Sequence, residues 1–182
     1  IKDLELDDKV YKPSSVLGRI SSAKSNLLTA NEYIKNLELI ESDKAMRRPK
    51  LGEIFSIYSE KCKRASAMDF DDLLLKPIQL FDNHPDILEK YQERWKFIHI
   101  DEYQDTNKAQ YLLARMLAKK HRNLCVVGDD AQSIYAFRGA DITNILSFQR
   151  DYPNAQTIRL EQNYRSSQRI VRFADSIIKN NR

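Results

Sequence analysis

Residues 96–107 read KFIHIDEYQDTN, and this stretch decides the fold class. The apolar run KFIHI has the length of a β-strand and ends directly in two acidic residues, Asp101 and Glu102. The run NLCVV (123–127) ends just as abruptly in GDD, and AQTIRL (155–160) ends in EQNYR. Stretches with helical spacing separate the three runs. This alternation predicts an α/β fold in which three parallel strands are covered by helices on both faces.

The first third of the chain shows no strand pattern and is predicted to form a helical subdomain. Pro13 suits the start of a helix that continues with apolar residues at helical spacing. Thr29 and Glu32 form a capping-box pattern, which opens a second helix through Ile40. A third helix is expected over residues 51–65.

The stretch that leads into the first strand is also predicted to be helical. Asp69 is placed to cap a helix over FDDLLLKPIQLF (70–81), which Pro77 either kinks or ends. A shorter helix is expected to follow, up to Trp95. Three more helical stretches are predicted at residues 109–117, 142–148 and 166–179.

The composition is that of a globular chain, and 42% hydrophobic residues argue against disorder. The formal charge of +4 fits nucleic-acid binding without requiring it. Lysines and arginines cluster at residues 44–50 and 61–64, where a phosphate contact and a solvated helix face are both open interpretations. No run approaches the roughly 20 apolar residues of a membrane helix. A cytoplasmic protein is therefore expected.

The spacing of the cysteines and the scarcity of glycine argue against a zinc site and a phosphate-binding loop. Cys62 and Cys125 lie far apart and have no companions at metal-ligand spacing, so no zinc site is expected. Cys125 sits in an apolar run and is predicted to be buried and unreactive. Only four glycines occur, and no Gly-Lys dipeptide is present. These residues therefore lack a phosphate-binding loop of the Walker A kind.

The acidic pair Asp101–Glu102 carries the strongest chemical signal. Nucleoside triphosphatases use acidic residues at the end of a buried strand to hold magnesium and to activate water. One carboxylate can bind the metal or its water shell, while its neighbour accepts a proton from the attacking water. The simpler interpretation is an acid-rich helix start with Asp105 or Thr106 as the cap. The preceding strand and the following QDTN favour the catalytic interpretation.

Polar and aromatic residues follow the second predicted strand in GDDAQSIYAFRGA (128–140). Gln132 on this loop can reach a terminal phosphate bound at the neighbouring strand. Tyr135 and Phe137 precede Arg138, and aromatic rings beside an arginine can stack on single-strand bases without reading their identity. The alternative is that both rings belong to the core.

A third signal, Tyr164 and Arg165, follows the third apolar run. An arginine in such a place can stabilise charge on a transferring phosphoryl group. The tyrosine can stack on a base or on a nucleotide ring. Taken alone, this dipeptide carries no information.

In this order, the three segments resemble the superfamily 1 DNA helicases of the UvrD, Rep and PcrA type, and the match to PcrA-like members is close. The resemblance covers nearly the whole chain and includes LGRISSAKSNLL (17–28) and MDFDDLLLKPIQLF (68–81). It implies two RecA-like P-loop NTPase motor domains, each with an inserted helical subdomain. The chain would then hold part of the first insertion (1–67), the later half of the first motor domain (68–160) and the start of the second (161–182).

The resemblance also implies a role for each residue that would meet ATP. Asp101 and Glu102 would serve Mg²⁺, and Glu102 would also be the catalytic base. Gln132 would sense the γ-phosphate and couple it to DNA. Tyr164 and Arg165 would meet ATP from the second motor domain, with Arg165 taking part in catalysis.

A single-stranded DNA track is implied for Phe70, Tyr135, Phe137 and Arg138. Phe137 stands where the family pattern has tryptophan, so it keeps a stacking face but offers less area. The implied activity is Mg²⁺-dependent ATP hydrolysis coupled to 3′-to-5′ translocation on single-stranded DNA and to unwinding at duplex junctions. Without a Walker A loop, this stretch alone is expected to bind ATP weakly and not to hydrolyse it.

Two other functions remain open at this point. The helical first third, with its basic clusters, suits a non-catalytic module that docks onto DNA or protein. The same motor also occurs in helicase–nuclease subunits. Preferred DNA structure, oligomeric state and pathway do not follow from these residues.

Overall fold

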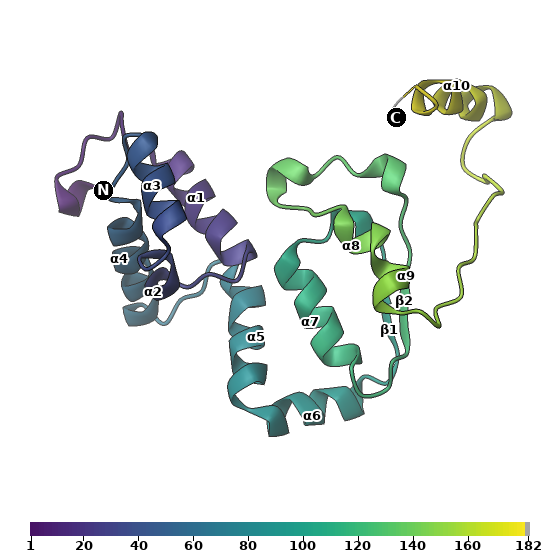
Figure 1. Cartoon of the computed structure of the whole chain (residues 1–182), viewed down its shortest axis with the longest axis horizontal. Helices are drawn as coiled ribbons and strands as arrows, with labels where there is room; N and C mark the ends of the chain where they lie inside the picture. Colours follow the sequence, from purple (N-terminus) through teal and green to yellow (C-terminus); the bar gives the residue numbers. More distant parts are fainter. Residues whose placement is uncertain (181–182) are drawn as a thin grey trace.

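The computed structural model describes residues 1–180, in which helices predominate and two short strands form a parallel sheet (Figure 1). The first third holds α1 (Pro13–Ser25), α2 (Ala30–Tyr33), α3 (Leu37–Ala45) and α4 (Leu51–Arg64). The middle holds α5 (Asp72–Asn83), α6 (Pro85–Arg94), β1 (Ile98–Ile100), α7 (Lys108–Ala118) and β2 (Leu124–Val126). The chain continues with α8 (Thr143–Leu146), α9 (Phe148–Asp151) and α10 (Gln168–Ile178).

The helices predicted for the first third are confirmed with one change. The capping box that opens α2 is present, because the Thr29 side chain accepts a hydrogen bond from the Glu32 amide. The predicted continuation of this helix through Ile40 is wrong, since α2 ends early and α3 starts anew. Asn36 explains the break: its side chain accepts a hydrogen bond from the Leu39 amide (3.1 Å) and so caps a new helix.

These four helices enclose a common core. Its buried residues are Tyr11, Val16, Ile20, Ala23, Tyr33, Leu51, Ile54 and Phe55. The Tyr33 hydroxyl donates to Asp43 Oδ2 (2.6 Å) and accepts from Arg19 Nε (2.9 Å). Burial and the bond to Asp43 raise the pKa of Tyr33 to about 12, so the hydroxyl stays protonated. This network satisfies the Asp43 carboxylate, which is 2% exposed.

Tyr33→Phe is expected to lower the free energy of unfolding of the chain by about 1–3 kcal/mol, because it leaves the buried Asp43 with one hydrogen bond fewer. Urea denaturation followed by circular dichroism measures the change. Tyr164→Phe is the matched control, since Tyr164 is 91% exposed and its substitution should leave the midpoint unchanged. Equal midpoints for Tyr33→Phe and the parent chain would contradict the assigned network.

α5, α6 and α7 pack against one another beside the sheet (Figure 1). α5 begins at Asp72 with Asp71 as its N-cap residue, so the predicted start at Phe70 with Asp69 as the cap is wrong by two residues. Asp69 still bonds to the start of the helix, because its Oδ1 accepts a hydrogen bond from the Asp72 amide (2.9 Å). Pro77 lies inside α5, which neither ends nor divides there. Of the two outcomes left open for this proline, the structure therefore excludes a helix end.

A buried lysine joins α1 to the start of α5. Lys24 Nζ lies 2.7 Å from Asp69 Oδ2 and 2.9 Å from Asp72 Oδ1, and the lysine side chain is only 3% exposed. The Tyr58 hydroxyl of α4 also donates to Asp69 Oδ2 (2.9 Å). Burial opposes the charged form of Lys24, but its bonds to the two carboxylates outweigh burial and raise its pKa. This cluster of Lys24, Tyr58, Asp69 and Asp72 ties the helical part to the rest of the chain.

β1 and β2 pair in parallel, as predicted, and the register places His99 opposite Cys125. Side chains alternate along a strand, so these two residues share one face of the sheet. Their strand neighbours on the other face are half-buried, whereas His99 and Cys125 are exposed. Phe97 and Val127, 72% and 46% exposed, flank the same two strands. Within residues 1–180 the prediction of helices on both faces is therefore wrong, and so is the prediction that Cys125 is buried.

The third predicted strand is also wrong. Residues 155–160 are irregular, and Ile158 and Leu160 are 79% and 82% exposed. A strand requires a hydrogen-bonded neighbour, and within residues 1–180 the sheet consists of β1 and β2. The helix predicted at 142–148 exists as two short pieces, α8 and α9.

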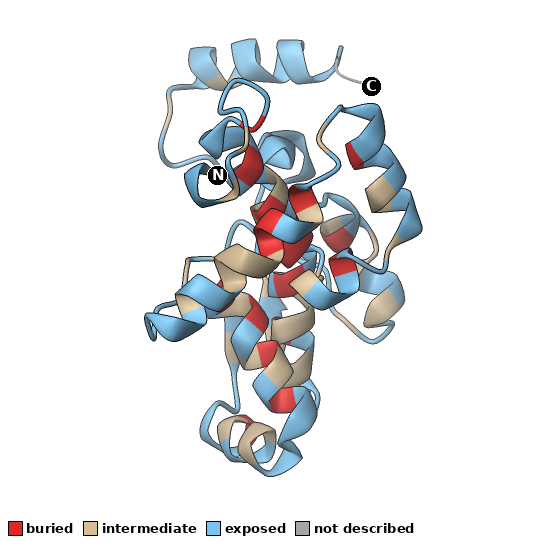
Figure 2. Ribbon diagram, turned by 90° about the vertical axis from the view of Figure 1, so that its left-hand side faces the viewer, coloured by how far each residue is buried: buried red, intermediate tan, exposed pale blue. Residues whose placement is uncertain are grey.

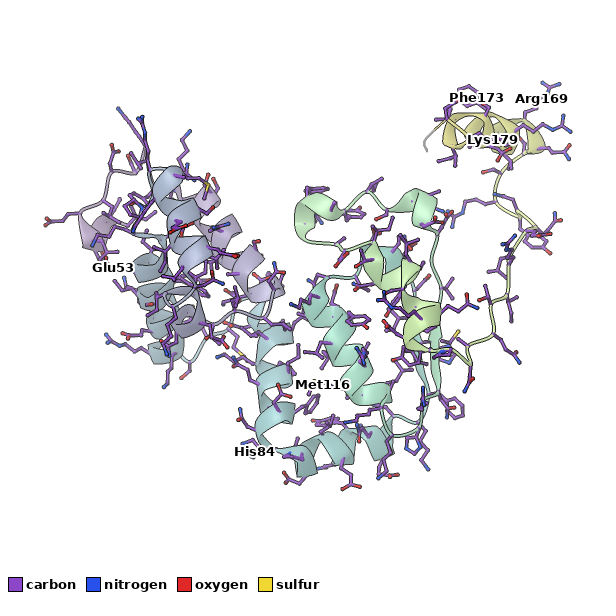
Figure 3. The ribbon with its side chains drawn as sticks, in the orientation of Figure 1. Glu53, His84, Met116, Arg169, Phe173 and Lys179 are labelled. Carbon is purple, nitrogen blue, oxygen red and sulfur yellow. The ribbon has the colours of Figure 1, made fainter. Side chains whose placement is uncertain are left out.

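α10 confirms the last predicted helix but stands apart from the other elements (Figure 1). None of its residues is buried (Figure 2). Arg169 and Phe173 lie on α10 and Lys179 directly follows it, at the outer end of the molecule (Figure 3). The expected segment 161–182 extends two residues beyond the described ones. No helix within residues 1–180 combines the length and apolar character that a membrane crossing requires.

Candidate active site

Asp101 and Glu102 lie at the carboxyl end of β1, where both side chains are exposed. Two backbone hydrogen bonds tie this point to the end of β2. The Val127 amide donates to the Ile100 carbonyl (2.8 Å), and the Tyr103 amide donates to the Val127 carbonyl (2.9 Å). The acidic pair therefore occupies the sheet edge at which parallel α/β sheets place their sites.

Glu102 adopts a left-handed backbone conformation, with φ 50° and ψ 43°. This conformation costs a residue other than glycine about 1 kcal/mol or more and persists only where the surroundings hold it. The next residue, Tyr103, supplies that support, because it is 0% exposed and packs edge to face on Phe148 with ring centroids 5.6 Å apart. The packing of Tyr103 in the protein interior therefore holds the turn at Glu102 in place.

The acidic pair does not belong to a helix start. A short 3-10 turn, Tyr103–Asp105, follows the pair, and α7 begins only after it. The cap of α7 is Asn107, whose side chain accepts a hydrogen bond from the Gln110 amide (2.9 Å). The alternative interpretation, with Asp105 or Thr106 as the cap, is therefore wrong.

A pocket of about 320 Å³ opens beside the acidic pair. Its lining residues are Ile100, Asp101, Glu102, Asp105, Thr106 and Gln110. Asp105 Oδ1 is buried and has no hydrogen-bond partner among residues 1–180. A buried carboxylate oxygen without a partner is costly. The pocket is lined by the carboxylates of Asp101, Glu102 and Asp105, which suits a cation.

The carboxylates at the pocket suit Mg²⁺ that is shared with water and phosphate oxygens. Among the described residues, no group of three or more His, Cys, Asp or Glu side chains is placed to hold a metal ion by itself. Mg²⁺ does not require such a cage, because it is commonly held by one or two carboxylates together with water and substrate phosphates. Asp101, Glu102 and Asp105 offer carboxylate oxygens of the required kind at one pocket.

A chain of hydrogen bonds through Asp129 and Gln104 links Gln132 to Glu102. Gln132 lies in the turn after β2 and is exposed. Its Nε2 donates to Asp129 Oδ2 (2.8 Å), and the Asp129 amide donates to Gln104 Oε1 (3.0 Å). Gln104 Nε2 in turn donates to Glu102 Oε2 (2.8 Å). The structure thus brings together the loops that carry Glu102 and Gln132.

Tyr135, Phe137 and Arg138 form one exposed cluster. The two rings are stacked with centroids 5.9 Å apart, and the Arg138 guanidinium carbon lies 5.4 Å from each centroid. Tyr135 is 39% exposed and Phe137 is 77% exposed. The alternative that both rings belong to the core is therefore wrong.

Phe70 is 90% exposed in the turn that precedes α5. The neighbouring Asp69 is bound by Lys24 at the end of α1. A Cβ atom added at Gly139, directly after the aromatic cluster, would lie 3.8 Å from Cβ of Ser25. The turn that carries Phe70 and the loop that carries Tyr135 and its neighbours therefore both lie at the C-terminal end of α1.

Tyr164 and Arg165 are not brought to the acidic pair. They lie on the irregular segment between α9 and α10, which runs outside the body of the molecule (Figure 1). Tyr164 is 91% exposed. The Asn163 side chain accepts a hydrogen bond from the Arg165 amide (2.9 Å), which shapes this turn locally.

Comparison with known proteins identifies the family. The model of the UvrD/REP helicase N-terminal domain matches residues 1–153, which is more than half of the chain. The chain belongs to the UvrD/REP helicase family. Within this family, the chain is similar to the ATP-dependent DNA helicase PcrA of Bacillus subtilis (50% identical), of Staphylococcus aureus (48%) and of Leuconostoc citreum (46%). Each match covers 100% of the chain and 23–24% of the relative, so the chain spans about a quarter of the length of these relatives.

The candidate site of this UvrD/REP family member includes residues that sequence analysis did not assign to it. Gln104 and Asp129 form the link between the two loops, and Asp105 adds a third carboxylate to the lining of the pocket. A signal was available, since all three belong to the polar strings that follow the two strands. Their roles depend on which atoms are buried, and a sequence pattern does not show that.

Proposed function

We propose that these residues form part of an ATP-dependent DNA helicase that translocates 3′ to 5′ on single-stranded DNA and unwinds duplexes. In this proposal residues 1–67 belong to a helical insertion, 68–160 to a first RecA-like motor domain and 161–182 to the start of a second. Family membership and the acidic pair at the end of β1 support it. The uncovered face of the sheet, with Phe97 and Val127 exposed, also supports a sheet that is larger in the full-length helicase.

The observation that carries the proposal is the pocket at the carboxyl end of β1. Asp101, with Glu102, would hold Mg²⁺, which when bound would neutralise charge on the phosphates of ATP. Glu102 would accept the proton of the attacking water. Gln132, on the adjoining loop, would sense the γ-phosphate. The ATPase activity of the full-length helicase with Glu102→Gln tests this assignment.

Tyr164 and Arg165 would reach the nucleotide only when the second motor domain closes on the first. Their exposure and the separation of α10 from the other elements support a segment that packs elsewhere in the full-length helicase. Arg165 would then stabilise charge on the transferring phosphoryl group, and Tyr164 would stack on the nucleotide. Both cysteines are free, which supports the cytoplasmic setting of the proposal.

The isolated chain of 182 residues is expected to bind ATP weakly and to show no measurable hydrolysis, because it has no Gly-Lys dipeptide for a Walker A loop. Isothermal titration of the purified chain with Mg²⁺-ATP measures the affinity. Micromolar affinity would contradict this expectation and would show that the pocket binds nucleotide without a phosphate loop.

Phe137→Ala in the full-length helicase is expected to weaken binding of single-stranded DNA by about 1–3 kcal/mol, since it removes a stacking ring. Fluorescence anisotropy with a labelled oligothymidylate measures the dissociation constant. Leu146→Ala is the control, because Leu146 is 63% exposed on α8 and lies outside the aromatic cluster. Equal losses in the two variants would remove Phe137 from the proposed DNA track.

A further inference from the structure

Gln104 is the most deeply buried polar side chain beside the candidate site. It is 1% exposed, although it lies two residues beyond the exposed Glu102. Its side-chain amide bonds in opposite directions: Nε2 donates to Glu102 Oε2 (2.8 Å) and, at longer range, to Asp105 Oδ2 (3.4 Å), whereas Oε1 accepts from the Asp129 amide (3.0 Å). These partners fix the orientation of the amide, because a backbone N–H only donates and a carboxylate only accepts.

The loop after β2 is fitted closely over this amide. A Cβ atom added at Gly128 would lie 2.6 Å from Gln104 Oε1 and 2.8 Å from Ile145 Cδ1. The Ser133 hydroxyl lies 3.5 Å from the backbone carbonyl oxygen of Gln104, at the limit of hydrogen-bond distance. The lack of a side chain at Gly128 is therefore what lets the loop approach Gln104.

The far end of the link is Gln132. Asp129 accepts one hydrogen bond from Gln132 Nε2 (2.8 Å) on Oδ2 and another from the Ala131 amide (3.0 Å) on Oδ1. A displacement of Gln132 therefore acts on Asp129, whose amide is bound to the buried Gln104. The side-chain amide of Gln104 also binds the Glu102 carboxylate. The backbone of Glu102 is held in its left-handed conformation by the packing of the neighbouring Tyr103.

We propose that Gln104 is a positioning residue that joins Glu102 and the loop of Gln132 into one hydrogen-bonded unit, so that the state of Gln132 sets the placement of the Glu102 carboxylate. This inference rests on the proposed function and extends it to the coupling between DNA binding and hydrolysis. Gln104 itself does not touch the reacting atoms. It acts through Glu102, as side chains behind a first layer of site residues commonly do.

The test is Gln104→Met in the full-length helicase, which preserves side-chain length but removes the hydrogen bonds to Glu102, Asp105 and the Asp129 amide. We expect kcat for ATP hydrolysis with saturating oligothymidylate to fall by about 10- to 100-fold. KM for ATP should stay within about a factor of two, because the substitution does not remove a contact to ATP. The basal rate without DNA should fall by a smaller factor than the DNA-stimulated rate, so that the ratio of the two rates decreases. An unchanged stimulation ratio would overturn the inference.

Gln92→Met is the matched control. Gln92 is also a buried glutamine, and its Nε2 donates to the Met116 carbonyl (2.7 Å) between α6 and α7, away from the pocket. It should lower stability without altering the stimulation ratio. If both variants change the ratio equally, Gln104 has only a structural role.

A double-mutant cycle identifies the route of the coupling. Gln104→Met should cost little further stimulation in a Gln132→Ala background, whereas independent roles would make the two losses add. If Gln104→Met does not fold, Gln104→Glu provides a second variant, because it keeps an acceptor for the Asp129 amide but replaces the donor to Glu102 by a carboxyl that repels Glu102 when ionised, so the stimulation ratio should again fall. Full ATPase activity of Glu102→Gln would instead refute the proposed function itself. An inactive Glu102→Gln with an unchanged ratio for Gln104→Met would refute this inference alone.

Discussion

Replacing Glu102 by glutamine in the full-length helicase will lower kcat for ATP hydrolysis by about 10²- to 10⁴-fold, while ATP and single-stranded DNA still bind. The amide keeps the size of the side chain and can still bond to Gln104, but it does not accept a proton from water at neutral pH. Glu102 is exposed at the end of β1, beside a pocket with room for phosphate and metal. The loss should therefore fall on the chemical step. Steady-state ATPase assays measure kcat, and titrations of the same preparation with ATP and with single-stranded DNA measure the two affinities.

Glu41→Gln is the matched control for Glu102→Gln, because Glu41 is an exposed glutamate on α3 and lies outside the pocket. Its ATPase activity should equal that of the parent protein. Unchanged hydrolysis in Glu102→Gln would contradict the motor proposal. That outcome would favour the remaining alternative, a module that docks onto DNA or protein without catalysis.

Lys24→Met in the 182-residue chain is expected to lower the free energy of unfolding by about 3–5 kcal/mol, because it leaves the buried carboxylate of Asp72 and the half-buried carboxylate of Asp69 without the lysine charge that pairs with them. Lys24 is 3% exposed and lies within 3 Å of both carboxylates. Methionine matches the lysine stem in size, so the loss reports charge and hydrogen bonding more than packing. Urea denaturation measures it.

Lys61→Met provides the control for Lys24→Met, because Lys61 also pairs with an aspartate, Asp3, but both side chains are well exposed. Surface pairs of this kind contribute little, so the midpoint should hardly move. A shift for Lys24→Met no larger than that of Lys61→Met would show that the buried cluster does not stabilise the chain.

The cluster of Lys24, Tyr58, Asp69 and Asp72 makes the stability of the chain depend on pH under acidic conditions. Burial alone would raise the pKa of Asp69, but hydrogen bonds from Lys24 and other neighbours outweigh it and lower the pKa below the ordinary value of 3.8. A carboxyl with a lowered pKa stabilises the fold above its unfolded pKa and loses that contribution as the pH falls through the folded value. The fall in stability below pH 3.8 should therefore be shallower in Lys24→Met than in the parent chain.

The sequence predicted the parts of the fold that depend on local pattern. The parallel pair β1 and β2 was visible because two apolar runs each end abruptly in polar residues. The acidic pair was placed correctly at a sheet edge for the same reason. The capping box at Thr29 was found because its two hydrogen bonds join residues close in sequence.

The parts that were missed depend on contacts between distant residues. The run at 155–160 has the composition of a strand but no neighbour to pair with in the described part of the chain. Cys125 was expected inside, although it faces a side of the sheet that no described element covers. The ion pairs of Lys24 with Asp69 and Asp72 join residues more than 40 positions apart, and no pattern near Lys24 in the sequence predicts them. Gln104 lies in the string KFIHIDEYQDTN, but its proposed positioning role rests on its burial and its hydrogen bonds, which the string does not show.

The most direct test of the account is a crystal structure of the full-length helicase with Mg²⁺ and a non-hydrolysable ATP analogue. We expect the metal to be bound by Asp101 directly or through one water molecule. Glu102 should lie within about 2.6–3.2 Å of the water aligned with the γ-phosphate, and Tyr164 and Arg165 should have moved to the nucleotide. A nucleotide bound elsewhere, with Asp101 and Glu102 facing solvent or engaged in salt bridges, would contradict the account.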